Sequence, residues 1–503
     1  LARALSGERW PGIHLDVDAL ARSLAKDEAI VAYRRYDRWD RKPKEVQGSN
    51  ARPTRTPVPS LCAFVLRRSG SSRESDASRG VVAAVDLGPI EPIAGAVRNW
   101  REGLGTATGR GVGTEAKPAA GSFAEKGNDL RRLLLDPLAA ELAGASRCVI
   151  VPDDVVHLVP FDALPRGGDS EELVGDHLRI ETRATVTELS VVPDLDAGSG
   201  RLVALGDVDF DSVANGSEAV LPGPSVSLAA LAGSPSEPEE PEEPEIPGSG
   251  GNPRELASIL RGGDFGGFAP LPATRSEVEA LTESFREHVG RSEEISILRG
   301  ADATRRRWME LAPRGRWLHV ATHGWFAPES IRSWKDEEPL DAHSGLGMRL
   351  SGEEQVKGMS PMLLCGLALA GANLPEDDAG RAPGLITAEE IAALDLARCE
   401  LAVLSACDTN VGERRAGQGV ASLQQALQMA GARSVITSLW KVPDEATREL
   451  MVDFYHRMWV EKKPKWQALW EAKKKLREAV DRSGRLRYST RDWAAWVMTG
   501  EPD

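Results

Sequence analysis

Two reactive side chains follow apolar runs that are typical of buried strands. His323 comes directly after WLHVAT (317–322), and Cys407 comes directly after LAVLSA (401–406). In open α/β sheets ligands bind beyond the carboxyl ends of the strands, where we expect both side chains to lie. A thiol beside an imidazole can act as a nucleophile with its base, because the imidazole accepts the thiol proton and later protonates the leaving amine. The pair therefore predicts acyl transfer through a thiolate.

Backbone donors for a developing oxyanion can be named from the same positions. Gly324 has no Cβ, so its backbone can approach a substrate closely. We expect the N–H groups of Gly324 and Cys407 to face the oxyanion, where one donor contributes about 2.7–4 kcal/mol. No third member is assigned to the pair. The alternative for both reactive residues is structural, since a cysteine at a strand end is usually core packing and a histidine beside glycine is usually a satisfied loop or core residue.

The elements that would position these residues follow a strand–helix rhythm. From about residue 126, short apolar runs alternate with amphipathic helical patterns. This alternation predicts an α/β fold with a mostly parallel central sheet and helices on both faces. We expect one large domain over residues 126–503, preceded by a small α/β module over 1–125. That module has strand-like runs at 61–66 and 80–88 and a helical pattern at 93–104.

Composition excludes several classes of protein. The 503 residues carry a net charge of −14, which argues against a general nucleic-acid binder. No run reaches the roughly 18–20 apolar residues of a membrane span, and no secretory signal opens the chain. The five cysteines are scattered without a CxxC pair, so we expect no disulfide framework, no zinc site and a reducing cytoplasm. The sequence shows no cluster of metal ligands, and we expect neither a metal nor a cofactor. Segment 233–253, with Glu alternating with Pro, is expected to be a disordered loop. Since the chain starts at Leu1, we expect a fragment or processed product.

Several motifs occur together in one order: CVIVPDDVVHLVPFDALP (148–165), LHVATHG (318–324), LITAEEIAALDLARCELAVLSACDTNVG (385–412), a segment from GQGVASLQ to FYHRMW (417–459), and DWAAWVMTG (492–500). Over about 126–502 the chain resembles the CHAT family of caspase-like cysteine peptidases. The resemblance implies a caspase-like three-layer sandwich, with His323 as general base and Cys407 as nucleophile. It also implies a protein substrate, and latency until a regulatory protein or repeat module activates the enzyme, in bacterial defence or signalling.

Substrate-binding residues are expected near SLWKVPD (438–444), where caspase-like peptidases pair with an extended peptide. Ser438 and Trp440 are candidates for the cleft, although core packing is the alternative for Trp440. Asp444 and Asp408 are candidates to bind an Arg or Lys before the scissile bond through a charge-assisted bond. A helix N-cap is the alternative for Asp444, and Lys441 nearby opposes a basic substrate.

Two other functions are alternatives to a peptidase. The first is a non-catalytic scaffold or protein-interaction module with the same fold, against which the presence of both His323 and Cys407 argues. The second is a nucleotide-binding α/β protein. The chain has no GxxxxGKS/T motif, and no GxGxxG follows a strand, which disfavours nucleotide binding.

Overall fold

The computed structural model describes a large part of the chain, in segments. Cys407, Asp408 and the acidic segment 233–253 lie outside the described residues. The described residues are 16–39, 57–68, 80–104, 120–167, 172–190, 200–214, 267–289, 295–326, 361–363, 365–375, 383–405 and 423–503.

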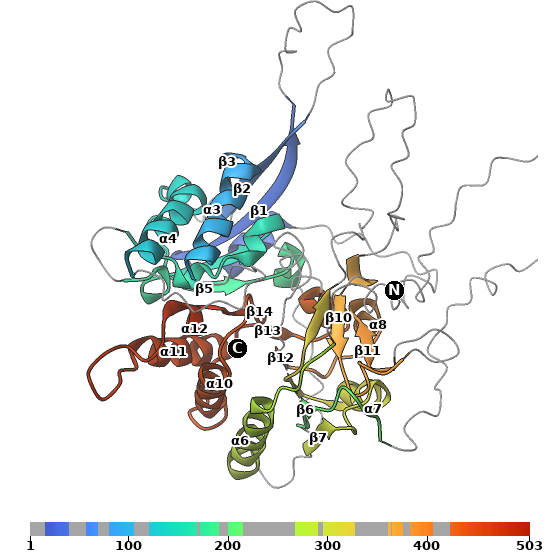
Figure 1. Cartoon of the computed structure of the whole chain (residues 1–503). Helices are drawn as coiled ribbons and strands as arrows, with labels where there is room; N and C mark the ends of the chain where they lie inside the picture. Colours follow the sequence, from blue (N-terminus) through green and yellow to red (C-terminus); the bar gives the residue numbers. More distant parts are fainter. Residues whose placement is uncertain are drawn as a thin grey trace, which may run out of the picture.

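An 11-stranded sheet runs through the molecule (Figure 1). Neighbouring strands are parallel except for the pairs β1/β2, β2/β3 and β13/β14, so the predicted mostly parallel sheet is confirmed. In spatial order the strands are β3 (Gly80–Pro89), β2 (Val58–Arg68), β1 (Glu28–Arg38), β4 (Arg147–Val151), β5 (Arg179–Thr182), β14 (Trp496–Gly500), β13 (Ser434–Ser438), β12 (Leu401–Leu404), β8 (Trp317–Val320), β6 (Leu202–Val208) and β7 (Ile295–Gly300).

Both faces of the sheet are covered by helices, as the continuous apolar runs predict. In β12, Leu401 and Val403 pack into one core cluster, whereas Ala402 and Leu404 pack into a second cluster on the other face. The first face is covered by α3 (Ile90–Gly103), α4 (Ala120–Leu134), α6 (Ala273–His288), α10 (Asp444–Trp459), α11 (Lys465–Glu478) and α12 (Thr490–Ala494). The second face is covered by α2 (Val17–Ser23), α7 (Arg305–Leu311), α8 (Ala388–Ala392) and a helix over 423–429.

The N-terminal strands extend the same sheet. β1 pairs in parallel with β4, with Ala29 opposite Cys148. The predicted strands and helix of the N-terminal module correspond to β2, β3 and α3, and β1 is an additional strand of 11 residues. The division between residues 1–125 and 126–503 stays a prediction.

A small second sheet lies beside the larger one, in the order β11 (Leu385–Thr387), β10 (Cys365–Ala368) and β9 (Gly324–Phe326). Gly366 in β10 allows close approach, because a Cβ there would lie 1.9 Å from the Ile386 carbonyl oxygen. Short 3-10 helices link the larger elements: η1 (Asp136–Leu138), η2 (Asp154–Leu158), η3 (Phe161–Ala163), η4 (Val174–Asp176), η5 (Val186–Ser190), η7 (Ala312–Arg314) and η9 (Pro361–Leu363).

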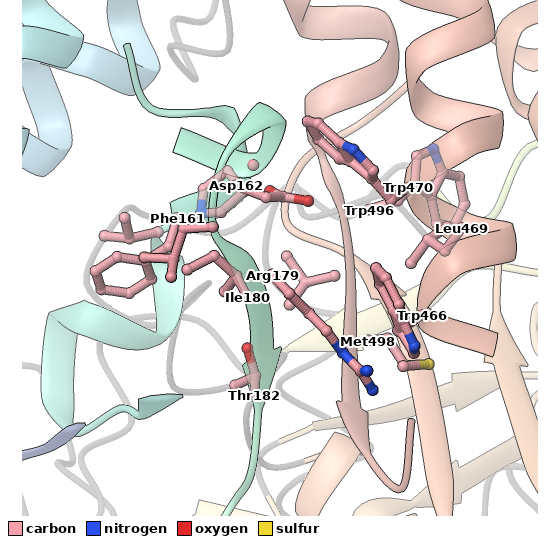
Figure 2. A pocket seen from close by; sticks show the side chains of 15 residues that line it. Phe161, Asp162, Arg179, Ile180, Thr182, Trp466, Leu469, Trp470, Trp496 and Met498 are labelled. Atoms are coloured by element: carbon pink, nitrogen blue, oxygen red, sulfur yellow. The ribbon is translucent and has the colours of Figure 1, made fainter. Parts of the chain in front are cut away.

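The sheet has a weak joint between β5 and β14. Among the described residues these strands pair only at Thr182 and Thr499. A cavity of about 50 Å3 lies at this joint. Figure 2 shows Phe161 and Asp162 on one side of it and Trp470 of α11 on the other. Side chains of α11 therefore hold the two parts of the sheet together here. No helix among the described residues is long and apolar enough to cross a membrane.

Candidate active site

The strands that precede the two reactive residues are neighbours. β8 and β12 pair in parallel, and their last pair is Val320 with Leu404. One residue further, the Ser405 N–H donates to the Val320 carbonyl at 2.8 Å. The chain that leads to Cys407 therefore leaves the sheet beside the chain that leads to His323, as parallel strand ends predict. Since Cys407 lies outside the described residues, its pairing with His323 stays a prediction.

His323 lies between β8 and β9 with only 4% of its surface exposed. Its ring packs against Phe210 and Phe268, with centroids 5.2 and 5.7 Å away. Nε2 lies 2.8 Å from the carbonyl oxygen of Ala269. Because a carbonyl only accepts, this bond puts the proton on Nε2 and leaves Nδ1 of the neutral ring as an acceptor. The imidazole is thus held in the tautomer that a base needs.

The sequence did not reveal that the Ala269 carbonyl contacts the candidate base. Ala269 lies 54 residues before His323, in the segment leading into α6. Every residue has a backbone carbonyl, so no residue type marks this position. No acidic or amide side chain was expected to orient the histidine, and this carbonyl occupies that place.

The backbone around His323 is fixed by β10. The His323 carbonyl accepts from the Ala368 N–H at 2.9 Å, and the Thr322 hydroxyl donates to the Ala368 carbonyl at 2.6 Å. Gly324 is the first residue of β9, opposite Leu367. The roles of the Gly324 and Cys407 N–H groups at an oxyanion stay predictions.

The structure places the expected substrate-binding residues as follows. Ser438 ends β13 and is 5% exposed. Trp440 is 2% exposed, and its indole N–H donates to the Arg491 carbonyl at 2.8 Å, which favours the packing alternative. Asp444 is exposed in the first turn of α10, and the N-cap is Pro443, so the N-cap alternative for Asp444 is wrong. Whether Ser438, Trp440, Asp444 and the undescribed Asp408 bind substrate stays a prediction.

A buried polar cluster lies next to the two strand ends. It consists of Glu277 of α6, His319 of β8, Ser405 after β12 and Tyr455 of α10. His319 Nε2 is 3.1 Å from Glu277 Oε1, and His319 Nδ1 is 3.3 Å from the Tyr455 hydroxyl. The Ser405 hydroxyl donates to Glu277 Oε2 at 3.4 Å. Burial, and then the charge of Glu277, raise the pKa of Tyr455 well above its usual value. Glu277 was not anticipated from the sequence.

Two other cysteines are expected to be unreactive in the folded protein. Cys148 and Cys399 are fully buried, and burial raises the pKa of each thiol to about 12. At pH 8 both remain protonated, and the thiolate is the nucleophilic form. We therefore expect iodoacetamide at pH 8 to modify neither cysteine before unfolding, as read by peptide mass spectrometry. Rapid labelling of either residue in the native protein would contradict the described packing.

A metal centre and a ligand-binding cavity are the alternatives to a site at the strand ends. Among the described residues, no group of three or more His, Cys, Asp or Glu side chains could hold a metal ion. The cavity in Figure 2 is lined, within the described part of the chain, mainly by aromatic and apolar side chains, together with Asp162, Arg179 and Thr182. Its lining includes residues of two sequence motifs, 159–162 of the 148–165 segment and 496–498 of the C-terminal motif, but among the described residues no cysteine or histidine. The strand ends near His323 therefore remain the better candidate site.

Comparison with known proteins gives one match to a family. A family model described as the CHAT domain matches residues 124–501. Among solved structures, the chain is similar to the Arg-specific cysteine proteinase gingipain R, with a TM-score of 0.32 and 9% identity. That alignment covers 81% of this chain and 75% of the other. No curated protein matches the sequence.

Proposed function

Because this chain belongs to the CHAT domain family, we propose that it is a cysteine endopeptidase that cleaves one or a few protein substrates. Cys407 is the proposed nucleophile and His323 the proposed base. The observation that supports this most directly is the bond from His323 Nε2 to the Ala269 carbonyl, which leaves Nδ1 free of the proton. The adjacent ends of β8 and β12 further support it.

The proposed reaction proceeds in two steps. The Cys407 thiol gives its proton to His323, and the sulfur attacks the peptide carbonyl carbon, forming a C–S bond. The carbonyl oxygen becomes an oxyanion, for which the Gly324 and Cys407 N–H groups are the proposed donors. The C–N bond then breaks, and the leaving amine takes the proton from His323. Water, deprotonated by His323, attacks the thioester, and the C–S bond breaks to release the acid and restore the thiol.

We also propose that the substrate presents an Arg or Lys immediately before the scissile bond. Asp444 is exposed at the start of α10, and Asp408 follows the nucleophile in the chain. A carboxylate pairs with a guanidinium or ammonium in a charge-assisted bond. Ser438 is proposed to contribute to the same cleft. Trp440 is retained only as a residue that supports the cleft from the core, because its indole is buried.

A regulatory protein or repeat module is the proposed activator of a latent enzyme, and bacterial defence or signalling in the cytoplasm is the proposed setting. This part of the proposal rests on the family resemblance alone. It predicts that the isolated chain cleaves proteins more slowly than the chain with its activator.

The proposal is tested by mapping new protein N-termini in cells that express the wild-type chain or Cys407→Ala. We expect the wild type to generate a small set of new N-termini after Arg or Lys, and Cys407→Ala to generate none. Cys62→Ala is the matched control, because Cys62 lies in β2, far along the sheet order from β8 and β12. Cleavage that persists in Cys407→Ala would overturn the proposal and leave a scaffold as the better function.

A further inference from the structure

One buried carboxylate contacts both strands that lead to the proposed catalytic pair. Glu277 Oε1 accepts from His319 of β8 at 3.1 Å, and Glu277 Oε2 accepts from Ser405 at 3.4 Å. His319 lies four residues before His323, and Ser405 lies two residues before Cys407. Glu277 is therefore connected to the base through one strand and to the nucleophile through the other.

The carboxylate is held deep in the protein. The exposed fractions are 5% for Glu277, 0% for His319 and 1% for Tyr455. Burying a carboxylate is costly unless hydrogen bonds compensate, and well-packed apolar residues often stabilise a core as much or more. The cluster therefore contributes little net stability once the cost of desolvating the carboxylate is included. It is better explained by the geometry that it imposes on the ends of β8 and β12.

The N-terminal half of α6 makes further contacts of the same kind. The segment before the helix supplies the Ala269 carbonyl that holds His323. Thr274, in the first turn, accepts from the N–H of Asp207 at the end of β6 at 2.7 Å. Together with Glu277, these contacts connect one short stretch of chain to the ends of β6, β8 and β12.

From these contacts we infer that Glu277 is a positioning residue for the Cys407–His323 pair, because its two oxygens bond to side chains of both chain segments where the backbone pairing of β8 and β12 ends. This inference rests on the proposed function. A misplacement of about 1 Å far from the reacting atoms can cost roughly 10²-fold in rate. Loss of the link between the strands is therefore expected to reduce the assistance that His323 gives to Cys407.

Three substitutions in α6 distinguish a positioning role of Glu277 from an effect on folding and from an effect of its negative charge. Glu277→Ala removes both links. Glu277→Gln keeps them, because the amide oxygen accepts from His319 and the amide nitrogen can donate to the Ser405 hydroxyl. Thr282→Val is the control: Thr282 is 2% exposed in the same helix, and its hydroxyl bonds to the Glu279 carbonyl of that helix.

The measurement is the rate of alkylation of Cys407 against pH, which needs no known substrate. We expect Glu277→Ala to slow the reaction at pH 7 by about 10-fold or more and to move its midpoint toward that of an ordinary thiol. In Glu277→Gln and Thr282→Val the alkylation rate should stay within about 3-fold of wild type, because His323 and Cys407 keep their positions. A purely structural Glu277 would lower the melting temperature without moving the midpoint.

His323→Ala, measured alongside, separates the two proposals. If His323→Ala leaves the Cys407 profile unchanged, the proposed function fails. If His323→Ala slows the reaction and Glu277→Ala does not, only the positioning role fails. Equal losses in Glu277→Gln and Glu277→Ala would also overturn it, because charge and not position would then matter. If Glu277→Ala does not fold, Ser405→Ala removes the link to β12 alone, and a Cys407 profile equal to that of wild type would overturn the inference.

Discussion

Replacing His323 with Ala is expected to lower the rate of peptide cleavage by roughly 10²- to 10⁴-fold, the usual contribution of a positioned acid or base. The reason is that the His323 ring both accepts the thiol proton to form the thiolate and later protonates the leaving amine. An unassisted thiol with a pKa near 8.5 is only about 0.3% thiolate at pH 6. Alkylation of Cys407 at pH 6 should therefore fall in His323→Ala, with the midpoint moving up toward pH 8.5.

The direction of this pH effect follows from the sign of the interaction. A neighbouring imidazolium favours the thiolate, so the paired thiol reacts at a lower pH than the free thiol. His288→Ala is the matched control. His288 is an exposed histidine in the last turn of α6 whose ring bonds to the Ser284 carbonyl of the same helix. If the pH profile of Cys407 alkylation in the wild type already resembles that of an unpaired thiol and does not change in His323→Ala, the two residues do not form a catalytic pair.

The adjacency of the two strand ends that precede His323 and Cys407 was predictable, because parallel strands bring their carboxyl ends to one edge. The apolar runs at 317–322 and 401–406 contain β8 and β12, and the pairing of Val320 with Leu404 confirms that they are neighbours. Periodicity distinguished strands from helices through most of the sheet. Such patterns depend only on the types of side chain at regular spacing, which can be read from the sequence.

The supports of the site were not predictable, for two different reasons. The Ala269 carbonyl has no sequence signal, since hydrogen bonding by the backbone depends only on where the chain runs. Glu277 sits in TRSEVEALT, where a glutamate is ordinarily solvated, and only the packing of α6 against β6 and α10 buries it. Trp440 had two interpretations, the cleft or core packing, and its edge-on contact with Trp100, with ring centroids 6.1 Å apart, favours packing.

The weak joint between β5 and β14 also depends on contacts that are distant in sequence. Asp176 accepts two hydrogen bonds from Arg477 of α11, at 3.0 and 2.9 Å. The Arg179 guanidinium lies 4.0 Å from the centre of the Trp466 ring (Figure 2). Lys473 of α11 is fully buried and bonds to Asp162 at 2.5 Å and to the Trp496 carbonyl at 3.0 Å. At this joint, α11 therefore contacts β5 and the segments before it through charged groups, while strand pairing between β5 and β14 is limited to one residue pair among the described residues.

Replacing Lys473 with Met is expected to lower the free energy of unfolding by about 3 kcal/mol. Methionine can fill the volume of the aliphatic chain, but it leaves the Trp496 carbonyl without its donor and Asp162 without its counter-ion. Removing one partner of a buried pair typically costs 3–5 kcal/mol, and the Asp162 side chain, 23% exposed, regains some hydration, which favours the lower end. The measurement is urea unfolding followed by tryptophan fluorescence and by circular dichroism, whose coincidence checks for a single transition.

Lys474→Met is the matched control, since the same substitution is made one residue further along α11. The Lys474 side chain is 47% exposed and lies 3.8 Å from Glu478, so its loss should change the free energy of unfolding by less than about 0.5 kcal/mol. Adding Asp162→Asn to Lys473→Met should cost much less than the sum of the two single changes, because the second removes a charge that the first has already left unpaired. Equal effects of Lys473→Met and Lys474→Met would mean that the joint is held by apolar packing and that the ion pair contributes little.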